Sequence, residues 1–437
     1  MAFDPVAYIN EPRWQESRLG LDRIRALLER LGRPQDRLKI VHVAGTNGKG
    51  STCAYLASVL RAAGHRTGLF TSPFIEAFEE RIQVDGAAIS RDALMDATLA
   101  VKEHAEALAA QTGDHPTEFE LMTAVALVHF ARRGCEAVVL EVGLGGRLDS
   151  TNAIEAPEVS VVARIGRDHT AMLGNTLAAI AAEKAGIIKP GVPVVSWPQD
   201  PGAMAVVERV AAENGAPLTV PDFTQLEIGP VDSRVRSFSY RGTRFQTRLL
   251  GSYQPANAAL AIETVQVLRG RGWRISNEAL HAGIAGAVWP GRFEIVRAGE
   301  GEPTIVVDGG HNPQGAQALV DSLVDVFPGL KPVFVIGVLE DKDYPAMLEA
   351  VLPLGSAFVA ITPDNPRALP ADKLARAIRW TGQDLLGCSA CVNPYAARSV
   401  QDAMARAREL AGPDGLVCAF GSLYSVAAIK QEIAAAK

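Results

Sequence analysis

Short runs of apolar, mostly β-branched residues alternate with alanine- and leucine-rich stretches along most of the 437-residue chain. Continuously apolar strands are typical of sheets covered on both faces, and strands spaced by helices form βαβ units with parallel neighbours. The alternation therefore predicts an α/β fold built on mainly parallel sheets. The predicted strands lie within residues 39–45, 137–143, 159–166, 192–197, 304–310, 332–338, 357–362 and 416–422.

Two segments depart from this alternation. Polar and apolar residues alternate around an Arg-Gly pair in residues 233–251, which predicts an antiparallel hairpin. Residues 287–304 are rich in glycine, proline and charge, and a fresh strand–helix alternation starts near residue 304. We expect the chain to divide in this tract, into a larger domain of residues 1–292 and a smaller one of residues 293–437.

Composition excludes several classes of protein. Forty-three basic and forty-nine acidic side chains give a net charge of −6, which argues against binding driven by nucleic-acid phosphates or by a membrane surface. The sequence has no run of about 18 uncharged apolar residues, so we expect no transmembrane helix. The N-terminal residues carry acids and lack the apolar core of a signal peptide. We expect a cytoplasmic protein with no nucleic-acid and no membrane partner. We also expect a monomer, although composition does not bear on this.

Cysteine usage points the same way. Five cysteines are too few and too scattered for a disulfide framework, and they fit a reducing cytoplasm. Cys388 and Cys391 form a CxxC pair, but no second pair stands at a spacing that would complete a zinc site. We interpret them as two small buried apolar side chains.

A glycine-rich turn is the first chemical motif. Residues 42–52, HVAGTNGKGST, run from a predicted strand through the turn into a helix. The N–H groups of such a turn converge on phosphate oxygens, and the helix N-terminus adds a favourable potential. The motif predicts a phosphate site in which Lys49 reaches the β- and γ-phosphates and Ser51 contacts a metal. Gly50 stands between them, unlike in the strict P-loop pattern, and an ordinary strand–turn–helix junction is the alternative.

Titratable residues follow other predicted strands, at the ends where α/β sheets bind ligands. Glu141 ends one strand and suits a Mg²⁺ that bridges phosphates, or it caps a helix or pairs with an arginine. Asp168 and His169 follow the next strand, although a lone histidine is more often structural than a ligand. Asp308 and His311 in DGGHNP suit a nucleotide or a carboxylate, with a tight capped turn as the alternative.

Lys184 lies in the alanine-rich stretch AAEKAGIIKP. A helical lysine is ordinarily a solvated surface residue. The small neighbours of this one permit close packing and burial, so a buried role is the competing interpretation.

Taken in order, these motifs resemble the folylpolyglutamate synthase and dihydrofolate synthase branch of the Mur ligases. Each piece is weak alone, but the ordered set is specific and covers nearly the whole chain. The matching segments are GTNGKGS, TSPF, FEERI, TEFELMT, EVGLGGRLDSTN, DHTAMLGNT, EKAGIIK, YQPANAALA, WPGRFE, DGGHNP, DKDY and GSLY.

The resemblance implies a P-loop Mur-ligase-type domain followed by a smaller Rossmann-like α/β domain. It implies a ligase that uses ATP and Mg²⁺, with two Mg²⁺ ions and a monovalent cation, to join L-glutamate to a folate through an acyl phosphate. Glutamylation of dihydropteroate stays open as a second activity. The alternatives are another Mur-type amino-acid ligase, although GTNGKGS begins at residue 45 and leaves no room for an N-terminal UDP-binding domain, and a nucleotide-binding P-loop regulator.

The resemblance also implies the site residues. The ATP-binding set is Thr46, Asn47, Gly48, Lys49, Gly50, Ser51, Asn257, Arg292, Asp308 and His311. The metal ligands are Ser72, Glu141 and His169, and the carbamylated lysine is Lys184. The folate-binding set is Phe74, Arg81, Thr117, Glu118, Phe119, Glu120, Leu148, Asp149 and Ser150. The glutamate-binding set is Asp308, His311 and Ser422.

Overall fold

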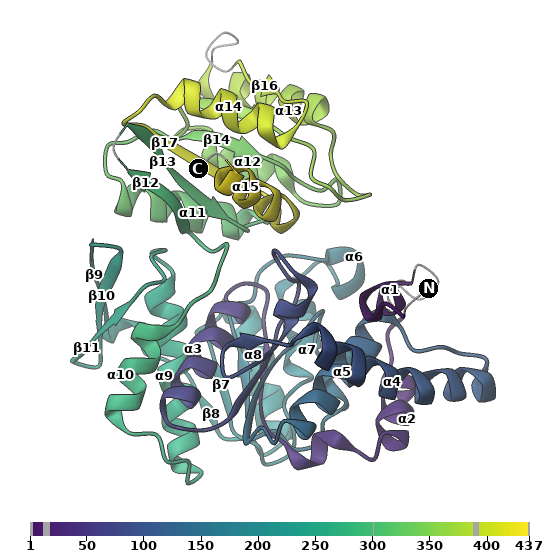
Figure 1. Cartoon of the computed structure of the whole chain (residues 1–437). Coiled ribbons are helices and arrows are strands. Elements are labelled where there is room, and N and C mark those ends of the chain that lie inside the picture. The colour runs from purple at the N-terminus through teal and green to yellow at the C-terminus, as the bar shows by residue number, and fades with distance from the viewer. Residues whose placement is uncertain (1–2, 12–17, 300, 388–392, 436–437) are drawn as a thin grey trace. The chain divides into compact units, whose positions relative to one another are not determined.

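A computed structural model describes residues 3–11, 18–299, 301–387 and 393–435, so Cys388 and Cys391 lie outside the described residues. The chain forms two compact units (Figure 1). The first unit comprises Met1–Glu227, Ser239–Gln246 and Pro255–Val288. The second comprises Ile228–Phe238, Thr247–Gln254 and Trp289–Lys437.

The first unit is built on an eight-stranded sheet. Its strands are β1 (Lys39–Ala44), β2 (Thr67–Phe70), β3 (Ile82–Val84), β4 (Ala87–Ala88), β5 (Ala137–Glu141), β6 (Val159–Val162), β7 (Val194–Ser196) and β8 (Leu218–Thr219). They lie in the order β4-β3-β2-β5-β1-β6-β7-β8. The six strands from β2 to β8 in this order are parallel, and only β3 and β4 pair antiparallel at one edge. The predicted parallel α/β sheet is confirmed.

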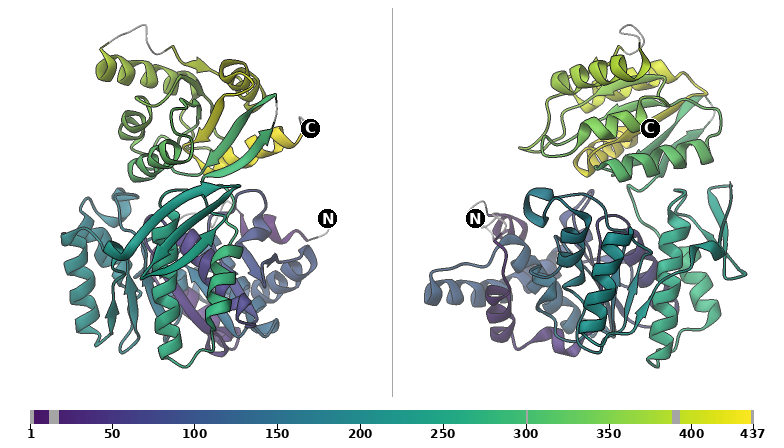
Figure 2. Two further views of the ribbon diagram at one scale, coloured as in Figure 1. Left: turned by 90° about the vertical axis from the view of Figure 1, so that its left-hand side faces the viewer. Right: turned by 180° about the vertical axis from the view of Figure 1, so that it is seen from behind.

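Helices cover this sheet and bury its apolar side chains. They are α1 (Pro5–Ile9), α2 (Asp22–Arg30), α3 (Lys49–Ala62), α4 (Arg91–Thr112), α5 (Glu118–Arg132), α6 (Thr170–Leu173), α7 (Leu177–Ala185), α8 (Pro201–Glu213), α9 (Gln254–Gly270) and α10 (Asn277–Gly286). Short 3₁₀ helices are η2 (Pro34–Arg37), η3 (Phe78–Arg81), η4 (Ser150–Ala153) and η5 (Phe223–Gln225). α3 packs on α10, α4 on α5 and α7 on α8 (Figures 1 and 2). None of the helices in the described ranges is both long and apolar enough to span a bilayer.

A small sheet interrupts the alternation where the sequence predicts a hairpin. It consists of β9 (Leu226–Asp232), β10 (Val235–Tyr240) and β11 (Thr243–Thr247), with β10 in the middle. Two-residue turns join these strands, and all four turn residues have positive φ: Ser233, Arg234, Arg241 and Gly242. Such turns match the twist of antiparallel neighbours. The hairpin around Arg241-Gly242 is therefore confirmed.

The second unit has a six-stranded sheet in the order β12-β13-β17-β14-β15-β16. Its strands are β12 (Glu294–Gly299), β13 (Glu302–Asp308), β14 (Val333–Ile336), β15 (Ala357–Ala360), β16 (Tyr395–Ala396) and β17 (Leu416–Phe420). All pairs are parallel except β12 with β13. The helices are α11 (Pro313–Val326), α12 (Tyr344–Val351), α13 (Ala371–Leu386), α14 (Val400–Ala411) and α15 (Leu423–Ala435). α11, α12 and α13 share one apolar core with β14 and β15.

One strand lies inside the 287–304 tract, before residue 304, where the sequence predicts that strands resume. Residues 294–299 form β12 and pair with β13. Glu294 and Arg297 interrupt the apolar residues of this edge strand, and Ile295 is only partly buried. A half-buried edge strand therefore has the composition of a loop.

Candidate functional site

The glycine-rich turn between β1 and α3 is held from two sides. The backbone N–H groups of Thr46 and Asn47 both donate to the carbonyl oxygen of Arg164, at 2.9 and 3.0 Å. Gly48, the residue before α3, has φ of 84°, a left-handed conformation that favours glycine. A Cβ atom there would lie 2.5 Å from Oδ1 of Asn257. The structure thus brings Asn257 to the turn, as expected for two parts of one nucleotide site.

This turn opens a 14-residue helix, α3. The first N–H groups of a helix lack partners within it and favour an anion. Ser51, in the first turn of α3, is buried, and Lys49 starts the helix. The strand–turn–helix geometry that the sequence predicts is present, and a phosphate site there stays a prediction.

Glu141 ends β5 beside this turn. β1 and β5 are parallel neighbours with Val43 opposite Glu141. Nζ of Lys49 lies 3.8 Å from Oε1 of Glu141, and the backbone N–H of Ser72 donates to Oε2 at 3.4 Å. Parallel strands bring their carboxyl ends to one edge, and here they bring a cation, a carboxylate and the predicted ligand Ser72 together.

The metal expected at this edge is Mg²⁺. Mg²⁺ usually binds through one or two carboxylates together with waters and substrate phosphates. Glu141 supplies one buried carboxylate next to the phosphate turn, so the residues present fit such an ion. Within the described part of the chain, no three His, Cys, Asp or Glu side chains gather into a metal-binding group.

His169, the third predicted metal ligand, is the residue before α6 and has φ of 49°. Positive φ is uncommon for residues other than glycine and marks candidates for function. Nε2 of His169 lies 3.9 Å from Oδ1 of Asp168, and the histidine side chain is 40% exposed. The role of His169 stays a prediction.

Lys184 is buried, with only 4% of its surface exposed, so the ordinary expectation of a solvated helix lysine does not hold. Its Nζ donates to the carbonyl oxygen of Gly45 in the glycine-rich turn, at 2.9 Å. Burial, together with the charge of Lys49, lowers the pKa of Lys184 to about 7, although Asp168 and other nearby acids oppose the shift. A lysine of this kind has an accessible neutral form near pH 7.

Three of the predicted folate residues lie near one another. The guanidinium of Arg81 lies 5.0 Å from the ring centroid of Phe74 and 5.4 Å from that of Phe78. Burial raises the pKa of Glu118, and the nearby charge of Arg81 opposes the rise. Aromatic rings beside a cation and a carboxyl group are the kinds of group that would suit a flat, polar-edged ring system.

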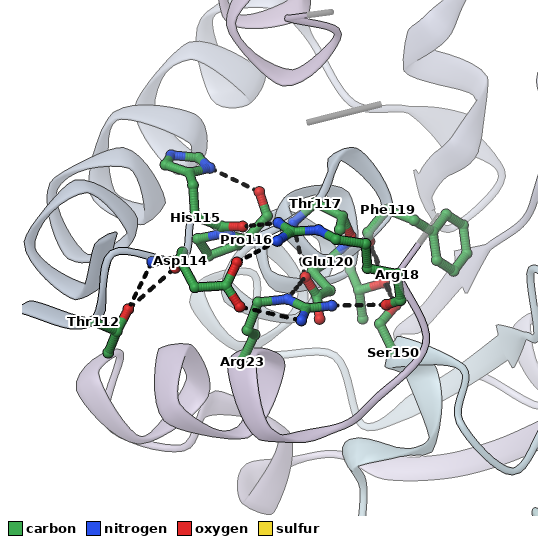
Figure 3. A network of polar contacts seen from close by, with 11 residues as sticks. Arg18, Arg23, Thr112, Asp114, His115, Pro116, Thr117, Phe119, Glu120 and Ser150 are labelled. Atoms are coloured by element: carbon green, nitrogen blue, oxygen red, sulfur yellow. Dashed lines mark hydrogen bonds and ion pairs between the residues drawn. The ribbon is translucent and has the colours of Figure 1, made fainter. Parts of the chain in front are cut away.

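Two other residues of the predicted folate set, Thr117 and Glu120, stabilise the start of helix α5. Thr117 and Glu120 form a capping box at the start of α5, in which the N–H of Thr117 donates to Oε2 of Glu120 at 2.7 Å. Nε of Arg23 donates to the same oxygen at 3.1 Å. Figure 3 shows this network, in which Arg23 also contacts Asp114 and the carbonyl oxygen of Arg18. The buried carboxylate of Glu120 is therefore engaged inside the protein.

Asp149 and Ser150 are also engaged internally. Asp149 is buried and accepts the N–H groups of Leu144 and Thr151, at 2.9 and 3.0 Å. Burial raises its pKa, and these hydrogen bonds oppose the rise. Oγ of Ser150 lies 2.7 Å from Oγ1 of Thr123 in α5. Leu148, next to them, is partly buried, as is Phe119.

The Arg23–Glu120 pair leads to a stability prediction. Breaking a buried ion pair on one side leaves an uncompensated charge and costs about 3 kcal/mol or more. Arg23→Ala should therefore lower the free energy of unfolding by about that amount in urea denaturation, and Arg23→Met with Glu120→Gln should recover part of the loss. Arg33→Ala removes a more exposed arginine and should cost much less, because solvent screens ion pairs at the surface. Equal losses in the two single variants would contradict the prediction.

In the second unit, Asp308 ends β13 opposite Phe420 of β17. Its buried carboxylate accepts the N–H groups of Phe293 and Gly310 and the hydroxyl of Tyr253, at 2.8, 2.6 and 3.1 Å. Burial raises its pKa and the charge of Arg292 opposes the rise. Asp308 and Arg292, both in the predicted ATP-binding set, thus lie near each other at the end of β13.

His311 and Ser422 belong to the same edge of the second sheet. Nδ1 of His311 lies 2.9 Å from the carbonyl oxygen of Gly309. Ser422 stands two residues after the end of β17, and the N–H of Gly421 between them donates to the carbonyl oxygen of Gly310 at 3.1 Å. The structure brings the three predicted glutamate residues to one sheet edge.

Sequence reasoning missed two residues that shape these sites. Arg164 holds the glycine-rich turn through its backbone carbonyl, which no side-chain pattern reveals. Arg23 fixes the start of α5, and its pairing depends on two segments far apart in the chain. The capping box was detectable, because Thr-x-x-Glu before an apolar run is its sequence signature.

Comparison with known proteins now defines the class. Residues 43–265 match the Mur ligase middle domain, and residues 291–423 match the Mur ligase glutamate ligase domain. The chain, with its α/β fold and its glycine-rich turn, therefore belongs to the Mur ligases.

The relatives define the branch. The chain is 36% identical to the dihydrofolate synthase/folylpolyglutamate synthase of Bacillus subtilis, over 98% of this chain and 99% of the relative. It is 37% identical to the folylpolyglutamate synthase of Lacticaseibacillus casei, over 95% and 94%. The structure of Mycobacterium tuberculosis folylpolyglutamate synthase complexed with ADP and AMPPCP superposes with a TM-score of 0.86 at 31% identity, covering 98% of each chain. The chain belongs to the folylpolyglutamate synthase and dihydrofolate synthase family, which confirms the resemblance seen in the sequence.

Proposed function

We propose that this chain is an ATP-dependent ligase that joins L-glutamate to the carboxylate of a folate through an acyl phosphate. The observation that carries the proposal is the grouping at the glycine-rich turn: Lys49 beside the buried carboxylate of Glu141, and Lys184 bonded to the turn itself. A P-loop regulator would need a phosphate turn but has no need of a buried lysine there. The names of the two relatives support the ligase assignment.

The chemistry follows from the weakness of a carboxylate as an electrophile. Transfer of the γ-phosphoryl group of ATP to a carboxylate oxygen gives an acyl phosphate and ADP. The neutral amine of glutamate then attacks the acyl carbon, the amide bond forms, and phosphate leaves. Such a reaction depends on positioning and on neutralising charge, and Lys49 would offset the charge of the transferring phosphoryl group.

Bound Mg²⁺ would supply further charge neutralisation on the phosphate oxygens, held by Ser72, Glu141 and His169. Lys184 would add a further anionic oxygen. Its neutral amine attacks CO₂, an N–C bond forms as one C–O π bond breaks, and one proton is released. The resulting carbamate carries a negative charge that suits a second Mg²⁺. The burial of Lys184 and its lowered pKa support this step.

The remaining assignments made from the sequence are part of the proposal. Asn257, Arg292, Asp308 and His311 would contact ATP, and Asp308, His311 and Ser422 would contact glutamate. The predicted folate set would bind the folate. We also propose a monovalent cation, a monomeric state, a cytoplasmic location without nucleic-acid or membrane partners, and functional domains of residues 1–292 and 293–437.

The test is an assay of ATP-dependent phosphate release with tetrahydrofolate and with dihydropteroate, each with and without glutamate. The proposal expects release that requires both glutamate and tetrahydrofolate, together with a glutamylated product. Dihydropteroate is included because the B. subtilis relative is named for both activities. Release that needs neither substrate would favour a P-loop regulator, and no release in any mixture would favour a different Mur-type ligase.

Glu141→Gln tests the metal assignment. The side chain keeps its shape and loses its negative charge, so the fold should persist while the Mg²⁺ concentration for half-maximal activity rises about tenfold or more. The measurement is a Mg²⁺ titration of the steady-state rate at saturating ATP. Glu136→Gln, on an exposed side chain paired with His65, is the control. An unchanged Mg²⁺ requirement in Glu141→Gln would refute the assignment.

A further inference from the structure

The loop that follows β5 packs directly against the last turn of α7, which carries Lys184. The N–H of Arg147 donates to the carbonyl oxygen of Glu183 at 2.7 Å. A Cβ atom on Gly146 would lie 2.7 Å from that same oxygen and 3.1 Å from Cα of Lys184. The loop backbone therefore touches the helix backbone at the residue whose side chain enters the glycine-rich turn.

Asn152 joins the two segments at the other end of this contact. Its side chain is buried, and its Nδ2 donates to the carbonyl oxygen of Arg147 at 2.9 Å and to that of Gly186 at 3.1 Å. One amide group thus satisfies a loop carbonyl and a carbonyl at the end of α7. Buried carbonyls left without a donor are costly, so this amide fixes how the loop and the helix end meet.

The position of Lys184 depends on this contact. Gly186 caps α7, and its N–H donates to the carbonyl oxygen of Lys184. The loop and Asn152 therefore hold the helix on both sides of Lys184, at Glu183 and at Gly186. The Nζ atom of Lys184 must reach the carbonyl oxygen of Gly45, 2.9 Å away. A shift of α7 by about 1 Å would misplace such a group.

We propose that Asn152 is a positioning residue for Lys184: its amide fixes the end of α7 so that the lysine amine lies at the glycine-rich turn, ready to take up CO₂. The inference rests on the proposed function, because the carbamate is part of it. Asn152 acts through the backbone of α7.

The test measures the carbamate itself. The purified protein is equilibrated with ¹³C-bicarbonate over a range of concentrations, and the carbamate signal is followed by ¹³C NMR, with Lys184→Ala to assign it. Asn152→Asp keeps the size of the side chain and removes the amide donor. We expect its bicarbonate concentration for half occupancy to rise about tenfold, as for the loss of roughly one such interaction, while its ADP affinity stays close to that of the wild type.

Asn214→Asp is the matched control. Nδ2 of Asn214 donates to the carbonyl oxygen of Val210 at the end of α8, at 2.8 Å, so the same change is made at another helix end. It should leave half occupancy unchanged. If Asn152→Asp does not fold, Asn152→Ser, which keeps a shorter donor, should show the same direction of change with a smaller size.

The outcomes separate the two hypotheses. Suppose the wild type forms the carbamate and a folded Asn152 variant reaches half occupancy at the same bicarbonate concentration. This result overturns the positioning role and leaves the proposed function in place. A wild type without a Lys184-dependent signal overturns the carbamate and the positioning role together, while the phosphate-release assay still decides the ligase function.

Discussion

Lys184→Ala should remove most of the ligase turnover, by a factor on the order of 10² or more, as expected when an oxygen ligand of a catalytic metal is lost. The side chain is buried and bonded to the glycine-rich turn, so its effect should reach the phosphate site directly. The fold should persist, because α7 is already rich in alanine and alanine is the best helix former. The measurement is the steady-state rate of glutamate-dependent phosphate release, with thermal unfolding of the same samples. Lys102→Ala, on a more exposed side chain of α4, is the control.

Two further arms distinguish a carbamate from an ordinary lysine. Lys184→Arg should not restore activity, because a guanidinium keeps a positive charge and cannot take up CO₂. Added acetate should partly restore Lys184→Ala, since a small carboxylate can fill the vacated ligand position. Full activity of the arginine variant would show that the site needs a cation, and the carbamate would be refuted.

The fold was largely predictable because its strands are continuously apolar. β5, β6 and β7 consist of buried residues, as does β1 after its first residue, and all four were found from their apolar pattern. β2 was missed although it is buried as well, because Thr67 and Gly68 occupy half of its four positions and none of its apolar residues is β-branched. Strand β12 was missed because edge strands carry charges. An unbroken run of apolar, mostly β-branched residues, and not the length of the strand, decided which strands the sequence revealed.

The glycine-rich turn was predictable for a different reason. Phosphate binding by backbone N–H groups requires glycines in a fixed order between a strand and a helix, so Gly48 and Lys49 could be found from the sequence. The burial of Lys184 could not be derived from its residue type. Its alanine neighbours permitted burial, but the contact with Gly45 joins segments 139 positions apart.

Polar residues within one motif turned out to differ in what they face. Glu118 lies near Arg81, whereas Glu120, two positions on, is bound by the helix cap and by Arg23. Both are glutamates in the segment assigned to folate from the resemblance. Only the pairing across α2 and α5 separates them, which makes Glu118 the better candidate for a direct substrate contact.

Lys49→Ala should cause the other large loss, on the order of 10²-fold or more in turnover, because a preorganised charge on the transferring phosphoryl group disappears. Nζ of Lys49 is held near Thr46 and Glu141, at 3.4 Å from the carbonyl oxygen of Thr46 and 3.8 Å from Oε1 of Glu141. The lysine is thus already in place at the turn.

Nucleotide binding should weaken less than turnover in this variant, because the N–H groups of the turn and of α3 remain. The fall should therefore appear mainly in kcat, measured with saturating ATP, folate and glutamate, while ADP affinity by calorimetry changes far less. Lys49→Arg should not rescue, since the larger planar guanidinium does not replace a compact ammonium group in a packed turn. Near wild-type kcat in a folded Lys49→Ala protein would mean that the charge on the phosphoryl group is neutralised elsewhere, and the assignment of the glycine-rich turn as the site of transfer would fail.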